Sequence, residues 1–223
     1  MPDDDTGAIT AFYDRLATAP LVRGWRRQAA DALALEPGDT VVEMGCGTGA
    51  NLPYLRERVG PEGRVVGVDL TRGMLDRARR RVERAGWENV TLVRGDAARP
   101  PVEQADAVLG SFVVGLLDDP GQIVDRWLDL LTPGGSVAIL EAGRTDRTLA
   151  RPLNLAFRAF VRFSSPGGLT ARRSPARELD RRIAVAAHAL EVRTVERRHD
   201  SVALGLVTIT RGRLPADDRS SDP

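Results

Sequence analysis

Val41-Val42-Glu43-Met44-Gly45-Cys46-Gly47-Thr48-Gly49 is the most informative stretch of this 223-residue chain. Residues 40–44 read as a short buried strand, and a helical pattern follows over residues 48–59. Gly45, Gly47 and Gly49 stand between them, where glycine allows a sharp turn and a close approach of the backbone to a ligand. The stretch therefore predicts a ligand-binding loop between a strand and a helix.

An acidic residue follows on the next predicted strand, Val66-Gly67-Val68-Asp69. A carboxylate at this place can accept hydrogen bonds from both hydroxyls of a ribose. The simpler alternative is that the glycines only turn the chain and that Asp69 only caps the following helix. A nicotinamide dehydrogenase is the main functional competitor, but its loop reads G-x-G-x-x-G. The closer spacing of Gly45, Gly47 and Gly49 leaves less room for a pyrophosphate.

Strand and helix patterns alternate along the rest of the chain, which indicates βαβ units and a parallel sheet. The last two predicted strands are separated by too few residues for a crossover, so they must pair antiparallel. We expect a Rossmann-like α/β fold, with a mostly parallel seven-stranded sheet, a C-terminal antiparallel hairpin and helices on both faces. The expected strands are 40–44, 64–68, 90–93, 105–109, 136–140, 192–197 and 202–210, and the expected helices are 8–35 (broken near its middle), 48–59, 71–85, 120–131 and 175–190.

Composition is typical of a globular protein, with 42% hydrophobic and 28% charged residues. We expect a single domain over 1–213, with 144–175 as a lid or substrate insertion and 214–223 as a disordered tail. The acidic start has no apolar signal segment, and no run is long enough to span a bilayer, so we expect a cytoplasmic protein. A net charge of +1 argues against general nucleic-acid binding. The single cysteine, Cys46, excludes an intramolecular disulfide and a cysteine zinc site, and no metal is expected.

Four motifs in order resemble the class I S-adenosylmethionine-dependent methyltransferases over roughly residues 37–142. The glycine loop with its leading Glu43 resembles motif I of that family, and Asp69 matches its ribose-binding acid. Gly95-Asp96-Ala97 matches the position that contacts the adenine amino group. Leu131-Thr132-Pro133-Gly134-Gly135 matches the turn before the fifth strand.

The resemblance implies S-adenosylmethionine as cofactor and a role for each matching residue. Glu43 would hold the methionine end, the backbone of Gly45, Cys46, Gly47 and Gly49 would flank the sulfonium, and Asp69 would bind the ribose. Leu70 and Met74 would pack on the adenine, Asp96 with Ala97 would contact its amino group, and Ser111 would line the cofactor or acceptor pocket. Leu70 and Met74 are also ordinary core residues, and that interpretation stays open.

Methyl transfer from a sulfonium is an in-line displacement that needs mainly proximity and alignment. A base is required only if the acceptor must lose a proton. The catalytic residue is therefore left unknown, with His199 as a weak candidate. We place His199 in the turn after the sixth strand, on the ligand edge of the sheet, whereas His188 is expected to be structural.

Two further features concern the acceptor. Phe12-Tyr13-Asp14-Arg15-Leu16-Ala17 and Gly115-Leu116-Leu117 resemble the ubiquinone and menaquinone methyltransferase group, although Asp118 departs from that group's G-L-R-N. Residues 147–163 carry apolar and arginine residues at helical spacing, typical of a helix that lies on an anionic membrane or of a lid that packs on the domain.

These features favour a small apolar acceptor, a quinone precursor or a lipid, and we expect peripheral contact with the membrane through residues 147–163. The alternatives are a small polar metabolite as acceptor, and a cofactor-binding partner subunit without activity. The methylated atom and the oligomeric state stay open.

Overall fold

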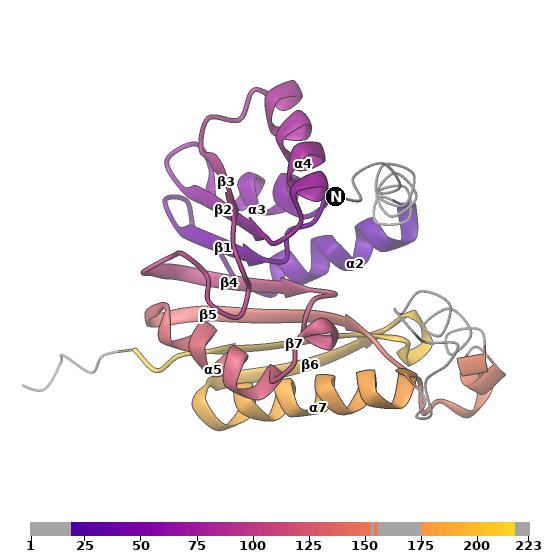
Figure 1. Cartoon of the computed structure of the whole chain (residues 1–223). Coiled ribbons are helices and arrows are strands. Elements are labelled where there is room, and N and C mark those ends of the chain that lie inside the picture. Colours follow the sequence, from indigo (N-terminus) through magenta and orange to yellow (C-terminus); the bar gives the residue numbers. More distant parts are fainter. Residues whose placement is uncertain (1–18, 153, 156–174, 217–223) are drawn as a thin grey trace, which may run out of the picture.

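A computed structural model describes residues 19–152, 154–155 and 175–216, which form a mixed sheet with helices on both faces (Figure 1). The sheet has seven strands in the order β3-β2-β1-β4-β5-β7-β6. The strands are β1 (Thr40–Met44), β2 (Arg64–Asp69), β3 (Val90–Arg94), β4 (Ala105–Ser111), β5 (Leu131–Ala142), β6 (Val195–Val202) and β7 (Val207–Arg213). The helices are α2 (Pro20–Asp31), α3 (Leu52–Val59), α4 (Arg72–Ala85), α5 (Pro120–Asp129) and α7 (Pro175–Arg193), with short 3-10 turns η1 (Val114–Leu116), η2 (Thr148–Ala150) and η3 (Ala203–Gly205). The expected fold class is confirmed.

The strand directions determine where a ligand can bind. β1 pairs in parallel with β2 and β4, β2 with β3, and β4 with β5, whereas β7 runs antiparallel between β5 and β6. The carboxyl ends of β1 to β5 therefore share one edge of the sheet. In open α/β sheets ligands gather at that edge, on either side of the point where the strand order reverses. Here that point lies between β1 and β4.

Successive residues of the central strands point to opposite faces of the sheet and are buried in two separate hydrophobic cores, one on each face. Val42 and Met44 face the core under α5 and α7, and Val41 faces the core under α2, α3 and α4. The buried indole of Trp127 on α5 donates a 2.7 Å hydrogen bond from Nε1 to the carbonyl oxygen of Ala97. This bond holds α5 against the segment that follows β3.

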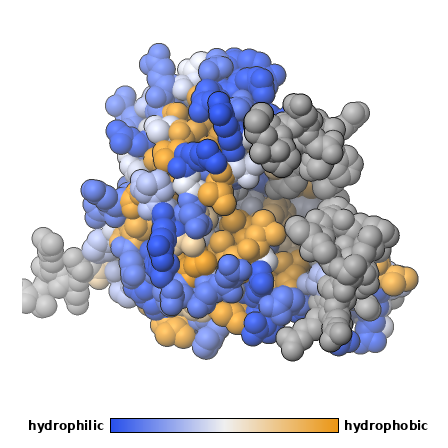
Figure 2. Space-filling model, viewed as in Figure 1, coloured by the Kyte–Doolittle hydropathy of each residue, from blue (hydrophilic) through white to orange (hydrophobic). Residues whose placement is uncertain are grey.

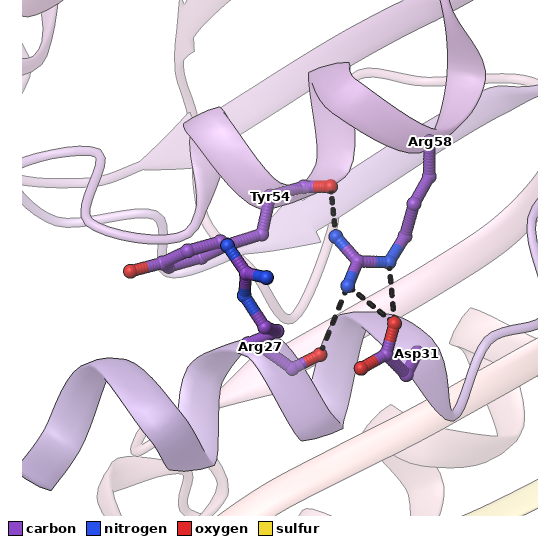
Figure 3. Close-up of polar contacts among 4 residues, drawn as sticks. All are labelled: Arg27, Asp31, Tyr54 and Arg58. Atoms are coloured by element: carbon purple, nitrogen blue, oxygen red, sulfur yellow. Dashed lines mark hydrogen bonds and ion pairs between the residues drawn. The ribbon is translucent and has the colours of Figure 1, made fainter.

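Polar contacts hold α2 against α3 (Figure 3). Arg58 of α3 donates from Nε to Oδ1 of Asp31 at 3.0 Å and from Nη2 to the carbonyl oxygen of Arg27 at 3.4 Å. The guanidinium of Arg27 lies 5.8 Å from the ring centroid of Tyr54. Exposed pairs of this kind contribute at most about 1 kcal/mol each. Their structural consequence is that α2 has a fixed position, from which Arg26 points into the protein.

The C-terminal part of the sequence prediction is wrong in its boundaries. α7 continues to Arg193 instead of ending near residue 190, and β6 runs from Val195 through residues 198–200, which we expected to form a turn. The turn is η3, where Ala203 and Leu204 both have positive φ. The reason is that residues 198–202 continue the ladder with β7, up to the pair Val202 and Val207.

Several expectations lie wholly or partly outside the described residues. These are the helix predicted before residue 19, residues 156–163 of the basic amphipathic segment, and most of the C-terminal tail. Within the described residues, no helix is both long enough and apolar enough to cross a membrane.

Leu128 provides a test of the α5 core. Its side chain is fully buried, whereas that of Leu204 is 57% exposed. We expect Leu128→Ala to lower the free energy of unfolding by about 2–5 kcal/mol, because it removes buried apolar contacts and leaves a cavity. Leu204→Ala should change it by less than about 0.5 kcal/mol. Urea titration of both variants measures the difference, and equal effects would contradict this packing.

Candidate active site

A pocket of about 740 Å³ opens at the carboxyl ends of β1 to β4. Its size lies within the roughly 300–1,000 Å³ typical of small-molecule sites. Each of the loops that follow these strands contributes to it, as does the start of α5. The lining residues are Gly45, Gly47, Asp69, Leu70, Thr71, Met74, Asp96, Ala97, Ala98, Arg99, Phe112, Val113, Leu116, Leu117, Asp118, Asp119, Gln122, Ile123 and Arg126.

The glycine loop after β1 needs glycine for two reasons. Gly45, Gly47 and Gly49 have φ values of 67°, 55° and 76°, in the left-handed region that other residues adopt only at a cost. A Cβ atom on Gly45 would also lie 2.6 Å from Cγ2 of Val113. The loop therefore brings bare backbone to the pocket, with Val113 packed directly behind Gly45.

Asp69 joins the loops after β1 and β2. Its Oδ2 accepts a 2.8 Å hydrogen bond from the backbone N–H of Gly47, and its Oδ1 accepts one of 2.8 Å from that of Thr71. The carboxylate therefore fixes the glycine loop and also satisfies a backbone donor at the start of α4. Thr71 itself makes no side-chain cap. Asp69 thus has the local role of a cap and also lines the pocket.

Leu70, Met74, Asp96 and Ala97 all reach the pocket, as their predicted roles require. The side chain of Leu70 is 64% exposed, so it is not a core residue. Asp96 is exposed and accepts a 2.8 Å hydrogen bond at Oδ1 from the backbone N–H of Ala98. The sequence motifs after β2 and β3 therefore meet in one pocket.

A buried polar network lies beside the glycine loop. Glu43 accepts a hydrogen bond from Nδ2 of Asn51, and Oδ1 of Asn51 accepts one of 3.0 Å from Nη1 of Arg26. The same nitrogen of Arg26 donates to Oγ of Ser111 at 3.1 Å. Ser111 is thus buried in the network and is not one of the residues that line the pocket. Arg26 and Asn51 were missed, because nothing in their local sequence distinguishes them from ordinary helical residues.

Glu43 is suited to hold a cation. It is 1% exposed, and its Oε2 has no hydrogen-bond partner among the described residues. Burial raises the pKa of Glu43 to about 7, although the hydrogen bond from Asn51 and the charge of Arg26 oppose this. An unpartnered buried carboxylate oxygen is costly, and a bound ammonium group would satisfy it. Glu43 is not among the residues that line the pocket, but it lies directly before the glycine loop, and its chemistry fits the amino-acid end of the expected cofactor.

Cys46 and His199 do not have the surroundings of catalytic groups. Burial raises the pKa of the Cys46 thiol well above its ordinary value, so the unreactive thiol form is favoured. His199 lies within β6, where its Nδ1 is 2.9 Å from Oγ1 of Thr210 and where it faces a separate hollow beside Leu190 and Glu191. Our placement of His199 in a turn at the ligand edge is wrong. His188 lies exposed on α7.

The sequence reasoning also missed one residue that lines the pocket and one buried residue that bonds to the segment after β4. Phe112, directly after β4, lines the pocket with a φ of 55°, which is unusual for a bulky residue. Glu141 lies at the carboxyl end of β5, is 3% exposed and accepts a 2.7 Å hydrogen bond from the backbone N–H of Val114. Within the described residues there is no group of three or more metal-ligating side chains.

Known sequences place this pocket in a methyltransferase domain. Residues 41–135 match the family model described as a methyltransferase domain. The chain is 36% identical over 131 residues to the aklanonic acid methyltransferase of a Streptomyces species, covering 58% of this chain and 59% of the relative. It is 29% identical over 143 residues to the demethylmenaquinone methyltransferase of Listeria welshimeri, covering 62% of this chain and 61% of that relative. It is also 36% identical over 114 residues to the arsenite methyltransferase of Halobacterium salinarum, covering 50% and 29%.

Solved structures agree on the fold. An O-methyltransferase family protein from Burkholderia thailandensis matches with a TM-score of 0.70 at 18% identity, covering 96% of this chain and 61% of that one. A SAM-dependent methyltransferase from Aquifex aeolicus matches with a TM-score of 0.65 at 18% identity, covering 92% and 98%. The chain spans less than two thirds of the length of the curated relatives named above. The match over residues 41–135 supports the expected methyltransferase domain, and the solved structures confirm its fold.

The raised pKa of Glu43 predicts a pH-dependent affinity for S-adenosylhomocysteine. At pH 6 the carboxyl of the free protein is mostly protonated, and binding of the ligand's ammonium favours its ionised form. Affinity should therefore rise about tenfold from pH 6 to pH 8, as a group with a pKa near 7 ionises. Isothermal titration calorimetry at both pH values measures this. Glu43→Gln should bind more weakly and show little pH dependence, and an equal rise in this variant would contradict the assignment.

The glycine loop predicts a contrast between two glycine variants. Gly45→Ala should lower the free energy of unfolding by about 1–3 kcal/mol and weaken cofactor binding at least tenfold, because of its positive φ and the overlap with Val113. Gly73→Ala, in α4, meets nothing within 4 Å and should be neutral or stabilising by up to about 1 kcal/mol. Urea titration and calorimetry on both variants check this. Normal binding by Gly45→Ala would show that the loop is only a turn.

Proposed function

Starting from this methyltransferase domain, we propose that the chain transfers a methyl group from S-adenosylmethionine to a small apolar acceptor, a quinone precursor or a lipid. The observation that carries the choice of acceptor is the apolar wall on the β4 side of the pocket. Phe112, Val113, Leu116 and Leu117 form it, and Leu116 is 77% exposed. Figure 2 shows hydrophobic surface gathered near the centre of this face, surrounded by hydrophilic residues.

The cofactor-binding roles proposed here are those that the resemblance implies, and the positions of the side chains support them. Glu43 holds the ammonium of the methionine end, and the backbone at Gly45 and Gly47 lies along it. Asp69 keeps its bonds to the backbone of Gly47 and Thr71 and accepts from the ribose hydroxyls with its remaining lone pairs. Asp96 and Ala97 would contact the adenine, and Leu70 and Met74 would pack on it. The bound cofactor supplies an activated methyl group, so the side chains mainly bind and orient.

The acceptor's chemistry determines whether a base is needed. Carboxylates at the pocket margin are Asp118 and Asp119, at the start of α5. Oδ1 of Asp119 accepts a 3.2 Å hydrogen bond from the backbone N–H of Gln122 and so caps the helix. A phenolic or enolic acceptor can lose its proton to water or to such a surface carboxylate. We therefore assign no catalytic base, and His199 is not retained for this role.

A polar acceptor and a subunit without activity are the competing functions. The arsenite methyltransferase among the relatives shows that a related domain serves a very different acceptor. The pocket also contains Arg99 and Arg126, but Arg126 donates to the carbonyl oxygen of Ala98 and to Oε1 of Gln122. The exposed Leu116 favours an apolar acceptor, because covering its side chain with apolar surface is favourable, whereas a polar ligand would gain no binding energy from it.

Contact with a membrane is the last part of the proposal. Thr145 after β5 donates from Oγ1 to the carbonyl oxygen of Leu204 at 2.6 Å, and its backbone N–H donates to Oδ1 of Asn154 at 2.8 Å. These bonds bring together two exposed leucines, Leu204 in η3 and Leu155, which are 57% and 72% exposed. The exposed Arg147 and Arg151 lie on the same connection. Leucines bordered by arginines suit the surface of an anionic bilayer.

Methyl transfer to a quinone precursor tests the proposed activity. With labelled S-adenosylmethionine, we expect label to enter a short-chain demethylmenaquinone or a phospholipid extract, and S-adenosylhomocysteine to be released. Asp69→Ala should lose at least tenfold in cofactor affinity, from ribose hydrogen bonds of roughly 1–3 kcal/mol. Asp76→Ala, on the exposed face of α4, is the matched control. If the cofactor binds but label enters only water-soluble compounds, the proposal of an apolar acceptor is wrong. If the cofactor does not bind, the proposed methyltransferase activity is wrong.

Vesicle flotation tests the membrane contact. The protein should float with phosphatidylglycerol vesicles at low salt and be released at high salt, because each basic residue near the surface contributes about 1 kcal/mol that salt screens. Replacing Leu155 and Leu204 together by alanine should abolish flotation. Val192→Ala, which removes a 69% exposed side chain at the end of α7, should leave it unchanged. If the native protein stays in the pellet at low salt, the membrane contact is wrong.

A further inference from the structure

The short segment after β4, residues 111–117, is held against the pocket in an uncommon way. Phe112 adopts a left-handed backbone, with its N–H bonded to the carbonyl oxygen of Leu140 at 2.8 Å. Such a conformation costs of order 1–3 kcal/mol for a residue other than glycine, and it persists only where the surroundings enforce it. Val113 then packs against Gly45 at the glycine loop. The segment is therefore one wall for the cofactor and, in the proposed function, for the acceptor.

Arg26 of α2 holds the first end of the segment. Its guanidinium carbon lies 5.3 Å from the centroid of the Phe112 ring, and its Nη1 donates to Oγ of Ser111 at 3.1 Å. Arg26 is only 5% exposed, so this contact is made away from water. The ring of Phe112 is therefore supported by a charged group that also reaches the network of Glu43 and Asn51.

Glu141 of β5 holds the other end. Its Oε1 accepts from the backbone N–H of Val114 at 2.7 Å, and the N–H groups of Val113 and Gly115 also favour its ionised form. Burial dominates and raises the pKa of Glu141 to about 8. A buried carboxyl is expensive to keep where an apolar side chain would pack, so its value must come from the backbone groups that it satisfies. In either protonation state an oxygen of Glu141 can accept from Val114.

We propose that Glu141 is a positioning residue, which by its hydrogen bond to Val114 fixes the wall of residues 112–117 against the glycine loop and so sets the fit of the cofactor. This rests on the proposed function, because it assigns the pocket to S-adenosylmethionine. Glu141 touches no ligand in this account. Its effect passes through the backbone of Val113 and Val114 to the contact with Gly45.

Three variants of the full chain separate positioning from simple stability. Glu141→Leu removes the acceptor, and Glu141→Gln keeps an acceptor oxygen at the same place. Ser136→Ala removes a buried hydrogen bond five residues earlier in β5. Oγ of Ser136 donates to the carbonyl oxygen of Leu33 at 2.6 Å. This bond lies near the amino ends of β1 and β4, whereas the pocket lies at their carboxyl ends. Two properties are measured well below the unfolding temperature: calorimetric affinity for S-adenosylhomocysteine, and amide hydrogen exchange of residues 112–117.

Glu141→Leu should exchange the Val114 amide at least tenfold faster and bind S-adenosylhomocysteine at least tenfold more weakly. Glu141→Gln should stay within about threefold of the native protein in both, and Ser136→Ala should lose stability without either change. The proposal is overturned if Glu141→Leu folds and keeps its affinity, if its exchange in residues 112–117 is unchanged, or if Ser136→Ala weakens binding equally. Should Glu141→Leu fail to fold, weak binding by the folded Glu141→Gln variant overturns it. If the native protein does not bind S-adenosylhomocysteine, the proposed function and the role of Glu141 are both refuted. If the native protein binds it but Glu141→Leu keeps the native affinity, only the role of Glu141 is refuted.

Discussion

The hydrogen bond from the backbone of Gly47 to the carboxylate of Asp69 is the constraint on which the pocket depends. It joins the turn after β1 to the end of β2, and the second oxygen of Asp69 joins both to the first residue before α4. Parallel strands leave their loops free at one edge, so something must fix those loops relative to one another. One carboxylate does this while remaining accessible from the pocket.

The surroundings of that bond divide into a polar and an apolar side. On the polar side Glu43, Asn51 and Arg26 form a chain of buried hydrogen bonds that ends on a carboxylate oxygen without a partner. On the apolar side Val113 packs against Gly45 of the glycine loop, and Phe112 lines the pocket. The zwitterionic end of S-adenosylmethionine fits the polar side, and the proposed acceptor fits the apolar side. Arg26 connects the two sides, since it bonds to Asn51 and lies on the ring of Phe112.

Sequence reasoning succeeded where local chemistry is restrictive. Glycine is favoured at Gly45 and Gly49, because their φ values are positive and a Cβ would overlap a neighbouring side chain. An acid that ends the next strand lies close to the loop in a parallel sheet, so both features could be predicted. Arg26 and Glu141 could not, because their partners lie far away in the sequence, at Ser111 and Val114. His199 was placed wrongly because pairing with β7, a tertiary property, extends β6 through residues that read as a turn. Ser111 lies in the right place but faces the buried network.

A crystal structure of the chain with S-adenosylhomocysteine tests the central claim most directly, that this pocket is built around the cofactor by Asp69 and Glu43. The account predicts a ribose whose hydroxyls lie within hydrogen-bond distance of Asp69, an ammonium on Oε2 of Glu43 and an adenine beside Asp96. A ligand bound elsewhere, or one that lies in the pocket while Asp69 and Glu43 touch neither ribose nor ammonium, would contradict it.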